Sequence, residues 1–326
     1  MPGFLLRRLG ASLLLLFLVL SLTFFLLHLA PGDPLGLVED SRLTPAERAN
    51  QQRIYGLGRP LPEQYAAWLS AVALRFDWGT SLSFNRPVTE LIAEALPATL
   101  ALAAAALAVE YGLGLALGVA AARRPGSALD HLIRVLSLLL TSQPAFWLSL
   151  MAVLLFALVW PVLPAGHLRS VGAEFLDPGR RFLDLLRHLA LPALVLGIHQ
   201  SGAIARVVRG SLLDALGRES ITAARARGLS ERRVLWVHAL RNALVPLIQL
   251  FALSATGLLS GAFVVEVVFS WPGIGGLTFG AISARDYPVV LATTALSATI
   301  VLVCNLAADV AHAVADPRVR DGLRDG

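Results

Sequence analysis

Three polar side chains interrupt long apolar stretches of this sequence, and they are the first candidates for chemistry. Glu110 lies in the middle of the run Leu96–Ala122, and His199 and Gln200 lie within the run Leu189–Ala205. Polar groups inside a bilayer usually face the protein interior or a water-filled cavity, because contact with lipid is costly. We therefore expect Glu110, His199 and Gln200 to line a pathway through the membrane or to hydrogen-bond between helices.

Glu110 is the most unusual of the three, because its position calls for an apolar residue. An unpaired charge at mid-membrane costs about 2.5–3.5 kcal/mol on insertion scales. Three accounts are open: pairing with a basic group such as His199, a retained proton, or contact with a cationic part of a solute. We place pairing first, since it needs no assumption about the solute, and solute contact second.

The sequence contains no recognisable constellation for catalysis or metal binding. Neither the H-E-x-x-H nor the G-x-S-x-G pattern occurs. The chain has no lysine, so it cannot contain a phosphate-binding loop of the type G-x-x-x-x-G-K-[ST]. Its single cysteine, Cys304, cannot form a disulfide within the chain. We therefore expect no catalytic residue, metal site or cofactor in this chain; if ATP drives the protein, another subunit hydrolyses it.

The composition indicates an integral membrane protein. Of 326 residues, 56% are hydrophobic and 15% are charged, and the mean hydropathy is +0.69. Soluble domains carry about 25% charged residues. All 27 basic residues are arginine, and many lie between apolar runs. Orientation in a membrane therefore explains the net charge of +5 better than nucleic-acid binding does.

Apolar runs of about 20 residues are long enough to cross a bilayer as helices. The first run is longer than the core of a signal peptide, which has roughly 7–15 residues, and no small-x-small cleavage site follows it. The sequence thus predicts an all-α integral membrane protein with six transmembrane helices. The six runs are Leu9–Ala30, Leu96–Ala122, Leu132–Val162, Leu189–Ala205, Ala243–Phe269 and Pro288–Ala315.

Arginines between the runs predict the orientation, because positively charged loops stay in the cytoplasm. Arg7 and Arg8 precede the first run, and eight arginines lie from Arg206 to Arg241. The opposite loops are longer and mix arginine with acidic residues. We therefore expect both termini in the cytoplasm.

The polar segment after the first run has helical patterns of its own. Thr44-Pro45-Ala46-Glu47 is typical of a capping box, which predicts a helix as far as Tyr55. A second helix is expected from about Pro62. Its stripe of Leu61, Tyr65, Trp68, Leu69 and Val72 either lies on the outer membrane surface or packs on a neighbouring helix.

A second polar segment, Ser211–Asn242, predicts three short helices on the cytoplasmic side. Ser211–Leu216 and Glu219–Arg227 form the first two, and Gly228 ends the second in the left-handed conformation. Ser230 is expected to cap the third helix, which leads into the fifth run.

This segment resembles the cytoplasmic EAA loop of ABC importer permeases, most closely those of the dipeptide, oligopeptide and nickel family in its first-permease (B-type) branch. The matching residues are Thr222-Ala223-Ala224-Arg225-Ala226-Arg227-Gly228-Leu229-Ser230, then His238-Ala239-Leu240-Arg241-Asn242-Ala243-Leu244 and Pro246. Thr222 stands where the loop is named for Glu, a substitution that this branch often shows. Further matching segments are Ala30–Pro34, Arg86–Val88, Leu96–Leu100, Pro144–Trp147, Val265–Gly275, Arg285–Pro288 and Asp316–Arg318.

The resemblance implies the type I ABC importer permease fold. It also implies a second homologous permease, two ABC ATPase subunits that use ATP and Mg²⁺, an extracytoplasmic binding protein, and a bacterial or archaeal plasma (inner) membrane. The solute is expected to be a di- or oligopeptide, with nickel chelates, glutathione or another small solute as alternatives. An ion-coupled transporter or channel is the alternative of a different class. The expected ATPase-coupling residues are Thr222, Ala223, Ala224, Arg225, Ala226, Arg227, Gly228 and Leu229.

The expected organisation follows from these assignments. Residues 1–30 form the first transmembrane helix, and 31–95 an extracytoplasmic segment with short helices. Residues 96–315 form the core of five transmembrane helices, which includes the coupling loop 211–242. Residues 316–326 form a cytoplasmic tail.

Overall fold

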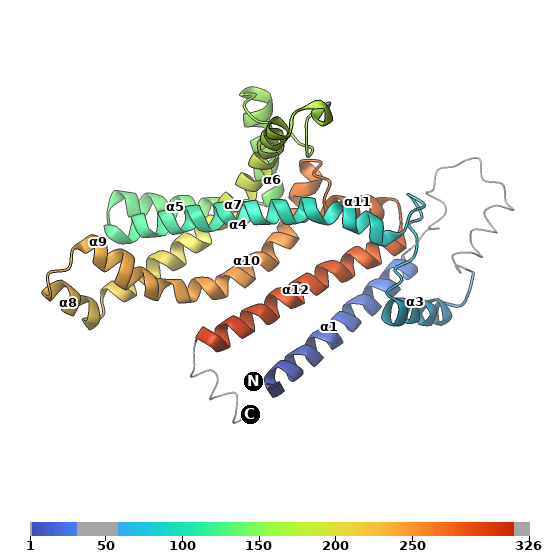
Figure 1. The fold of residues 1–326 in the computed structure, drawn as a ribbon, viewed down its shortest axis with the longest axis horizontal. Helices are drawn as coiled ribbons and strands as arrows, with labels where there is room; N and C mark the ends of the chain where they lie inside the picture. Colours follow the sequence, from blue (N-terminus) through green and yellow to red (C-terminus); the bar gives the residue numbers. More distant parts are fainter. Residues whose placement is uncertain (1, 31–57, 316–326) are drawn as a thin grey trace. The chain divides into compact units, whose positions relative to one another are not determined.

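The computed structural model describes residues 2–30 and 58–315, and the regular secondary structure of this part of the chain is helical, with loops between the helices (Figure 1). Within those ranges no strand forms, and the only extended pairing is an isolated bridge between Thr80 and Pro87. The all-α prediction is confirmed. The helix expected at Thr44–Tyr55 lies outside the described residues.

Four helices in the described part of the chain are long and apolar enough to cross a membrane, and a bent pair of helices makes a fifth if it counts as one span. The four long helices are Leu6–Leu29 within α1 (Pro2–Leu29), α4 (Val88–Arg123), α7 (Pro178–Leu216), and Tyr287–Ala307 within α12 (Tyr287–Ala315). The expected span Ala243–Phe269 corresponds to a further helix, α10 (Leu240–Val268), and some side chains of α10 lie outside the described part of the structure.

The bent pair replaces the single helix expected at Leu132–Val162, so that prediction was wrong. It consists of α5 (Ala128–Ser142) and α6 (Ala145–Val153), extended by a π-helical turn, η1 (Leu154–Val159), and the bend is 100°. Pro144 causes the break, because the residue before a proline is pushed out of the helical region. Gln143 accordingly has φ −84° and ψ 142°.

The fourth expected span proved to be the longest helix. In α7, Asp177 accepts hydrogen bonds from the backbone N–H groups of Gly179 and Arg180, and Pro178 occupies the first turn. Both features favour a helix start here. The helix continues to Leu216, so Ser211–Leu216 is its last part and not the separate short helix that was expected.

Among the described residues, one compact unit comprises 2–30, 58–98 and 272–300. It includes α1, α3 (Leu61–Arg75) and α11 (Ile274–Ser283). The rings of Tyr65 and Trp68 on α3 each lie 5.3 Å from the ring of Phe24 on α1, and the Tyr65 and Ser21 hydroxyls are 2.6 Å apart. Of the two alternatives for the aromatic stripe, packing on a neighbouring helix is the one observed (Figure 1).

A buried carboxylate organises the other end of this unit. Asp286, fully buried before α12, accepts hydrogen bonds from the Ser81 hydroxyl and, at 3.0 Å, from the Ser83 backbone N–H. The start of α12 is thereby tied to the loop that precedes α4. Two segments recognised in the sequence, Arg86–Val88 and Arg285–Pro288, belong to these two places.

The other unit comprises the described residues 99–271 and 301–315. Besides most of α4, it contains α5, α6, α7 and α10, and its chain also forms a 3-10 turn, η2 (Ala173–Phe175). Between α7 and α10 lie α8 (Glu219–Ala226), α9 (Glu231–Arg233) and a π-helical turn, η3 (Val234–Ala239).

Helices α4 and α7 approach so closely that glycines are required between them. A Cβ atom on Gly114 would lie 2.6 Å from the Cβ of Ile204, and one on Gly118 would lie 2.6 Å from the Cβ of Val208. The same holds for a glycine on the other helix: a Cβ on Gly197 of α7 would lie 2.5 Å from the Cβ of Val109 on α4. Small residues allow such backbone approach inside membranes, where dispersion contacts drive helix association.

Candidate coupling site

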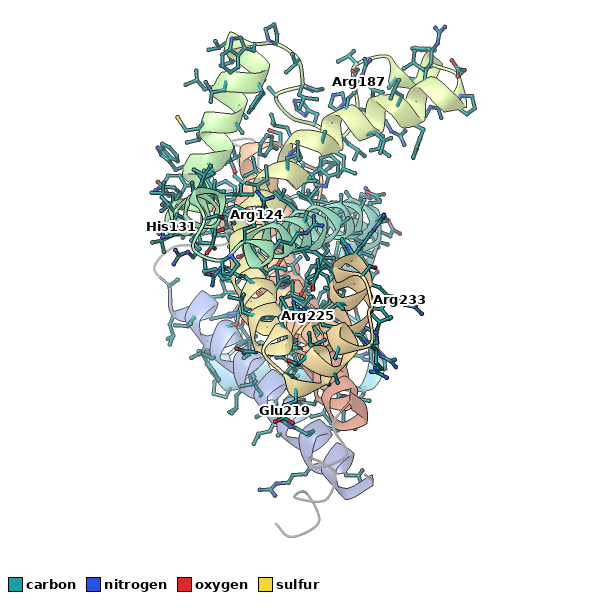
Figure 2. All side chains as sticks on the ribbon, turned by 90° about the vertical axis from the view of Figure 1, so that its left-hand side faces the viewer. Arg124, His131, Arg187, Glu219, Arg225 and Arg233 are labelled. Carbon is teal, nitrogen blue, oxygen red and sulfur yellow. The ribbon has the colours of Figure 1, made fainter. Side chains whose placement is uncertain are left out.

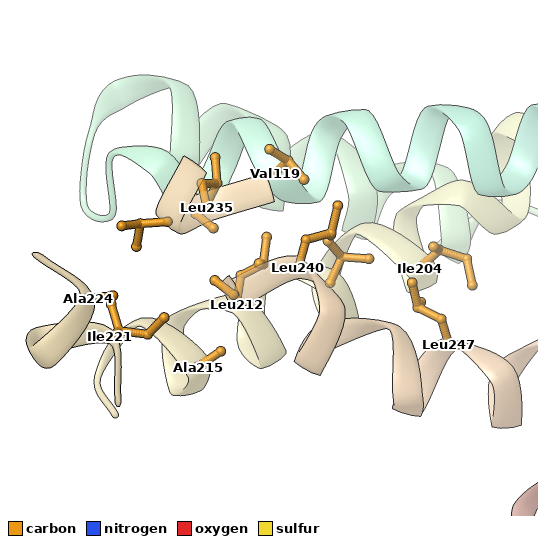
Figure 3. Close-up of a cluster of buried hydrophobic side chains, with 13 residues drawn as sticks. Val119, Ile204, Leu212, Ala215, Ile221, Ala224, Leu235, Leu240 and Leu247 are labelled. Atoms are coloured by element: carbon orange, nitrogen blue, oxygen red, sulfur yellow. The ribbon is translucent and has the colours of Figure 1, made fainter. Parts of the chain in front are cut away.

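The segment between α7 and α10 is built on a cluster of buried apolar side chains (Figure 3). Ile221 and Ala224 of α8 are buried there beside residues of α7 and η3. Burial of these two side chains stabilises α8, since an isolated helix of this length is unstable in water. The cluster consists of Val119, Ala122, Ile204, Val208, Leu212, Ala215, Ile221, Ala224, Val234, Leu235, Ala239, Leu240 and Leu247.

The outer face of α8 carries most of the expected coupling residues. Thr222, Ala223, Arg225 and Ala226 are exposed, as are Arg227 and Gly228 after the helix. Ala224 packs inward and Leu229 is half-buried, so these two support the segment from within. The result is an exposed helical face with two small side chains, a surface that another protein can approach closely.

Gly228 ends α8 as expected, with a left-handed φ of +78°. Its N–H donates to the carbonyl of Arg225 at 2.9 Å. Glycine has no penalty in this conformation. Ser230 stands before α9 as expected, but its side chain makes no capping hydrogen bond, and α9 is a three-residue turn that runs directly into η3.

An ion pair spans the turn that Gly228 makes. Arg225 donates to both carboxylate oxygens of Glu231, at 2.8 and 3.1 Å. This pairing holds the pKa of Glu231 below its usual range, so the pair is charged at neutral pH and is lost only when acid protonates the carboxylate. Both side chains are exposed, so the pair orients the turn but contributes little stability.

A second ion pair fixes the last part of α7, the helix that carries α8. Asp130 of α5 is fully buried and accepts from Arg209 of α7 at 2.6 and 2.7 Å, in the two-pronged geometry that favours arginine. Asp130 also accepts from the Gly126 backbone N–H at 2.9 Å. This pair was not predicted from the sequence. The feature of the sequence that could have drawn attention to Asp130 is the capping pattern Ser127-x-x-Asp130 at the start of α5.

The three polar residues expected in the membrane do not come together. The Oε1 atom of Glu110 accepts a hydrogen bond from the Ser254 hydroxyl of α10 at 2.6 Å. The Nδ1 atom of His199 lies 3.0 Å from the carbonyl of Leu140 on α5. Pairing of Glu110 with His199 was therefore wrong, because the two side chains point from adjacent helices toward different neighbours. Gln200 is half-buried beside His199 in α7.

Glu110 is 1% exposed, and among the described residues its Oε2 atom has no hydrogen-bond partner. A side chain so enclosed within its own subunit does not face an open pathway in this conformation. The geometry favours a role between helices α4 and α10. Another buried carboxylate, Glu266, makes a similar polar contact, because it accepts a hydrogen bond from the Thr99 hydroxyl at 2.7 Å.

We expect Glu110→Gln to assemble and transport like the parent, because the amide oxygen keeps an acceptor for Ser254. Glu110→Leu removes the acceptor of the half-buried Ser254 hydroxyl and is expected to destabilise the protein by about 1 kcal/mol, the typical net contribution of one hydrogen bond. Thermal unfolding of the purified complex and uptake in vesicles measure the two effects. Glu90→Gln, at an exposed position of the same helix, is the control. Loss of uptake by a fully assembled Glu110→Gln variant would contradict the interhelical role and favour solute contact.

Within residues 2–30 and 58–315, no group of three or more side chains of the metal-binding types comes together. The arrangement thus consists of apolar helices, a supported exposed loop and isolated buried polar contacts.

Comparison with known proteins explains this combination. Residues 114–321 match the family model described as binding-protein-dependent transport system inner membrane component. The chain belongs to this family. Residues 1–103 of the permease match the model for the N-terminal part of such membrane components.

Similar proteins cover the permease almost from end to end. The oligopeptide transport system permease protein AppB of Bacillus subtilis is 36% identical over 98% of this chain and 99% of its own length. The di/tripeptide transport system permease protein DppB of Pseudomonas aeruginosa is 38% identical, again over 98% and 99%. The dipeptide transport system permease protein DppB of Escherichia coli K12 is 35% identical over the same shares. The first-permease resemblance is confirmed.

Proposed function

We propose that this permease forms, with a second homologous permease, the pathway of an ATP-driven importer for di- and oligopeptides. Support comes from relatives named as dipeptide and oligopeptide permeases, which align over 98% of the chain. In this proposal two ABC ATPase subunits hydrolyse ATP with Mg²⁺, and an extracytoplasmic binding protein delivers the peptide. The permease contributes no catalytic residue.

The exposed face of α8 is the single observation that carries the mechanism. Residues 222–229 are proposed to dock on an ATPase subunit, with Ala223 and Ala226 permitting close approach. Because α8 is packed on the cluster beneath it, a displacement of α8 would be transmitted to α7 and α10. ATP-driven closure of the ATPases would thereby switch the transmembrane helices between inward and outward opening, a rigid-body transition.

The proposed topology has six transmembrane helices and both termini in the cytoplasm. Residues 1–30 form the first helix, 31–95 the extracytoplasmic segment and 96–315 the core with its loop 211–242, and 316–326 the tail. His199 and Gln200 are proposed to face the pathway. Glu110 would join them only in a conformation that opens the contact with Ser254.

We expect a reporter fused after Arg218 to be cytoplasmic and one fused after Glu47 to be external. The reason is the group of eight arginines from Arg206 to Arg241, since basic loops resist translocation. Paired alkaline phosphatase and fluorescent-protein fusions measure the two sides. Both reporters on one side would refute the six-helix topology.

The proposed activity is tested by uptake of a labelled dipeptide into vesicles that contain the complete complex and its binding protein. Uptake should require internal ATP and should disappear when the binding protein is omitted. Uptake driven by an ion gradient without ATP would instead identify an ion-coupled transporter. Competition by glutathione or a nickel chelate, but not by peptides, would reassign the solute.

A further inference from the structure

An open surface cavity of about 380 Å³ lies beside the coupling site and has no assigned role. It is formed by the turn and π-helical segment that follow α8. The lining residues are Ser230, Arg232, Arg233, Trp236 and Val237.

The cavity is positively charged and has no internal counter-charge. Arg232 and Arg233 are both exposed, and in the described part of the chain neither forms an ion pair. Glu231, which precedes Arg232, is engaged by Arg225 at 2.8 and 3.1 Å. Two guanidinium groups are therefore available to an anion, and arginine suits phosphate oxygens through its two-pronged geometry.

The same cavity has an apolar wall. In η3 the side chains of Val234, Leu235 and Ala239 are buried in the cluster, so the intervening part of the segment faces outward. Trp236 is 46% exposed and Val237 is 54% exposed. A ligand with both an anionic group and an apolar body would satisfy the two halves of the cavity together.

The position of η3 along the chain indicates the chemical class of the ligand that would occupy the cavity. The segment η3 leads directly into α10, whose sequence is apolar from Ala243 onward. Tryptophan is enriched at the level of lipid headgroups, and arginines beside it meet the anionic lipids of the cytoplasmic leaflet. Figure 2 shows Arg233 at the edge of the segment, apart from Arg225 on α8.

We propose that this cavity binds the headgroup phosphate of an anionic phospholipid, with Arg232 and Arg233 on the phosphate and Trp236 and Val237 against the adjoining apolar part. The lipid would hold the α8–α10 segment at a fixed depth in the membrane. The inference rests on the proposed cytoplasmic position of this loop. It does not depend on the peptide as solute.

The test is quenching of Trp236 fluorescence by brominated lipids in nanodiscs that contain the assembled complex. Parent and Trp236→Phe complexes are compared, so that the difference isolates this one tryptophan. At equal mole fraction, brominated phosphatidylglycerol should quench Trp236 more than brominated phosphatidylcholine does. In Arg232→Gln/Arg233→Gln the preference should fall roughly 10- to 30-fold, the effect expected of two basic side chains at an anionic surface.

Two further variants separate a specific site from general charge. Arg123→Gln/Arg124→Gln removes the same charge from exposed positions that do not line the cavity, and it should keep the preference. Arg232→Lys/Arg233→Lys should retain most of it, because lysine still binds phosphate as a point charge.

Equal quenching by the two lipids in the parent would overturn the proposal, as would equal loss in the Arg123/Arg124 control. Quenching that appears only after the ATPase subunits are removed would overturn it too, by identifying the cavity as an ATPase contact. The readout needs no transport, so failure of peptide uptake leaves it interpretable.

Discussion

The double variant Gly114→Ala/Gly118→Ala is expected to lose most of its folded, assembled protein. The added methyl groups would lie 2.6 Å from the Cβ atoms of Ile204 and Val208, and within 2.9 Å of the backbone carbonyl oxygens of Ser201 and Ala205. Flexible side-chain ends could yield to such contacts, but a backbone carbonyl in a helix cannot move alone. Each substitution should therefore cost about 1–3 kcal/mol through forced separation of α4 and α7.

The effect should reach the coupling site because of where these glycines lie. Val119, next to Gly118, and Ala122, about one turn further on, belong to the apolar cluster that supports α8. Separation of α4 from α7 would remove these side chains from the cluster. Variants that still assemble are thus expected to show weakened coupling as well as lower stability.

Gly112→Ala and Gly210→Ala are the matched controls, one on each helix, since a Cβ at either position has nothing within 4 Å. Both should melt at the parental temperature or slightly above, because alanine favours helices more than glycine does. The measurements are fluorescence-detected size exclusion and thermal unfolding of the purified complex. Parental stability of the double variant would mean that α4 and α7 are not closely packed at this place.

Local features of the fold were predictable from the sequence, because their causes are local. Gly228 ended a helix where its missing Cβ permits a positive φ, and Tyr65 and Trp68 lay on one helical face. The break at Pro144 follows from the same kind of rule, and the polar residues Thr141, Ser142 and Gln143 stand directly before it. The spacing Gly114-x-x-x-Gly118 was likewise readable as a close helix contact.

The contacts between distant residues were not predictable, because apolar periodicity does not say which helices are neighbours. Asp130 and Arg209 are 79 positions apart, and Glu110 and Ser254 are 144 apart. His199 was the expected partner of Glu110 on the ground of charge alone. The structure instead supplies a hydroxyl from α10, which satisfies one carboxylate oxygen without introducing a second charge.

Gly228→Val is expected to assemble normally but to lose most of its peptide uptake and peptide-stimulated ATP hydrolysis. The backbone at this position has φ +78°, and a residue with a Cβ pays roughly 1–2 kcal/mol for that conformation, with β-branched side chains at the upper end. A Cβ here meets nothing within 4 Å. The penalty therefore arises from the backbone and is relieved when the turn after α8 changes shape.

A changed turn would misalign the two sides of the proposed docking surface. The Arg225–Glu231 pair spans the turn, and its two-pronged geometry depends on the path of the chain between them. The buried contacts of Ile221 and Ala224 should persist, since they lie on the other face of α8. Stability should hence change little while coupling falls, roughly tenfold if the 1–2 kcal/mol penalty opposes docking.

Two controls separate backbone conformation from side-chain bulk. Gly228→Asn should keep much of the coupling, because asparagine tolerates the left-handed region. Gly217→Val places the same bulk at the end of α7, where φ is −80° and the nearest atoms to a Cβ are 3.7 Å away, and it should couple like the parent. If Gly228→Asn fails as completely as Gly228→Val, bulk at the docking surface is the cause. If Gly228→Val couples normally, the left-handed turn has no part in transmission from the ATPase to the membrane helices.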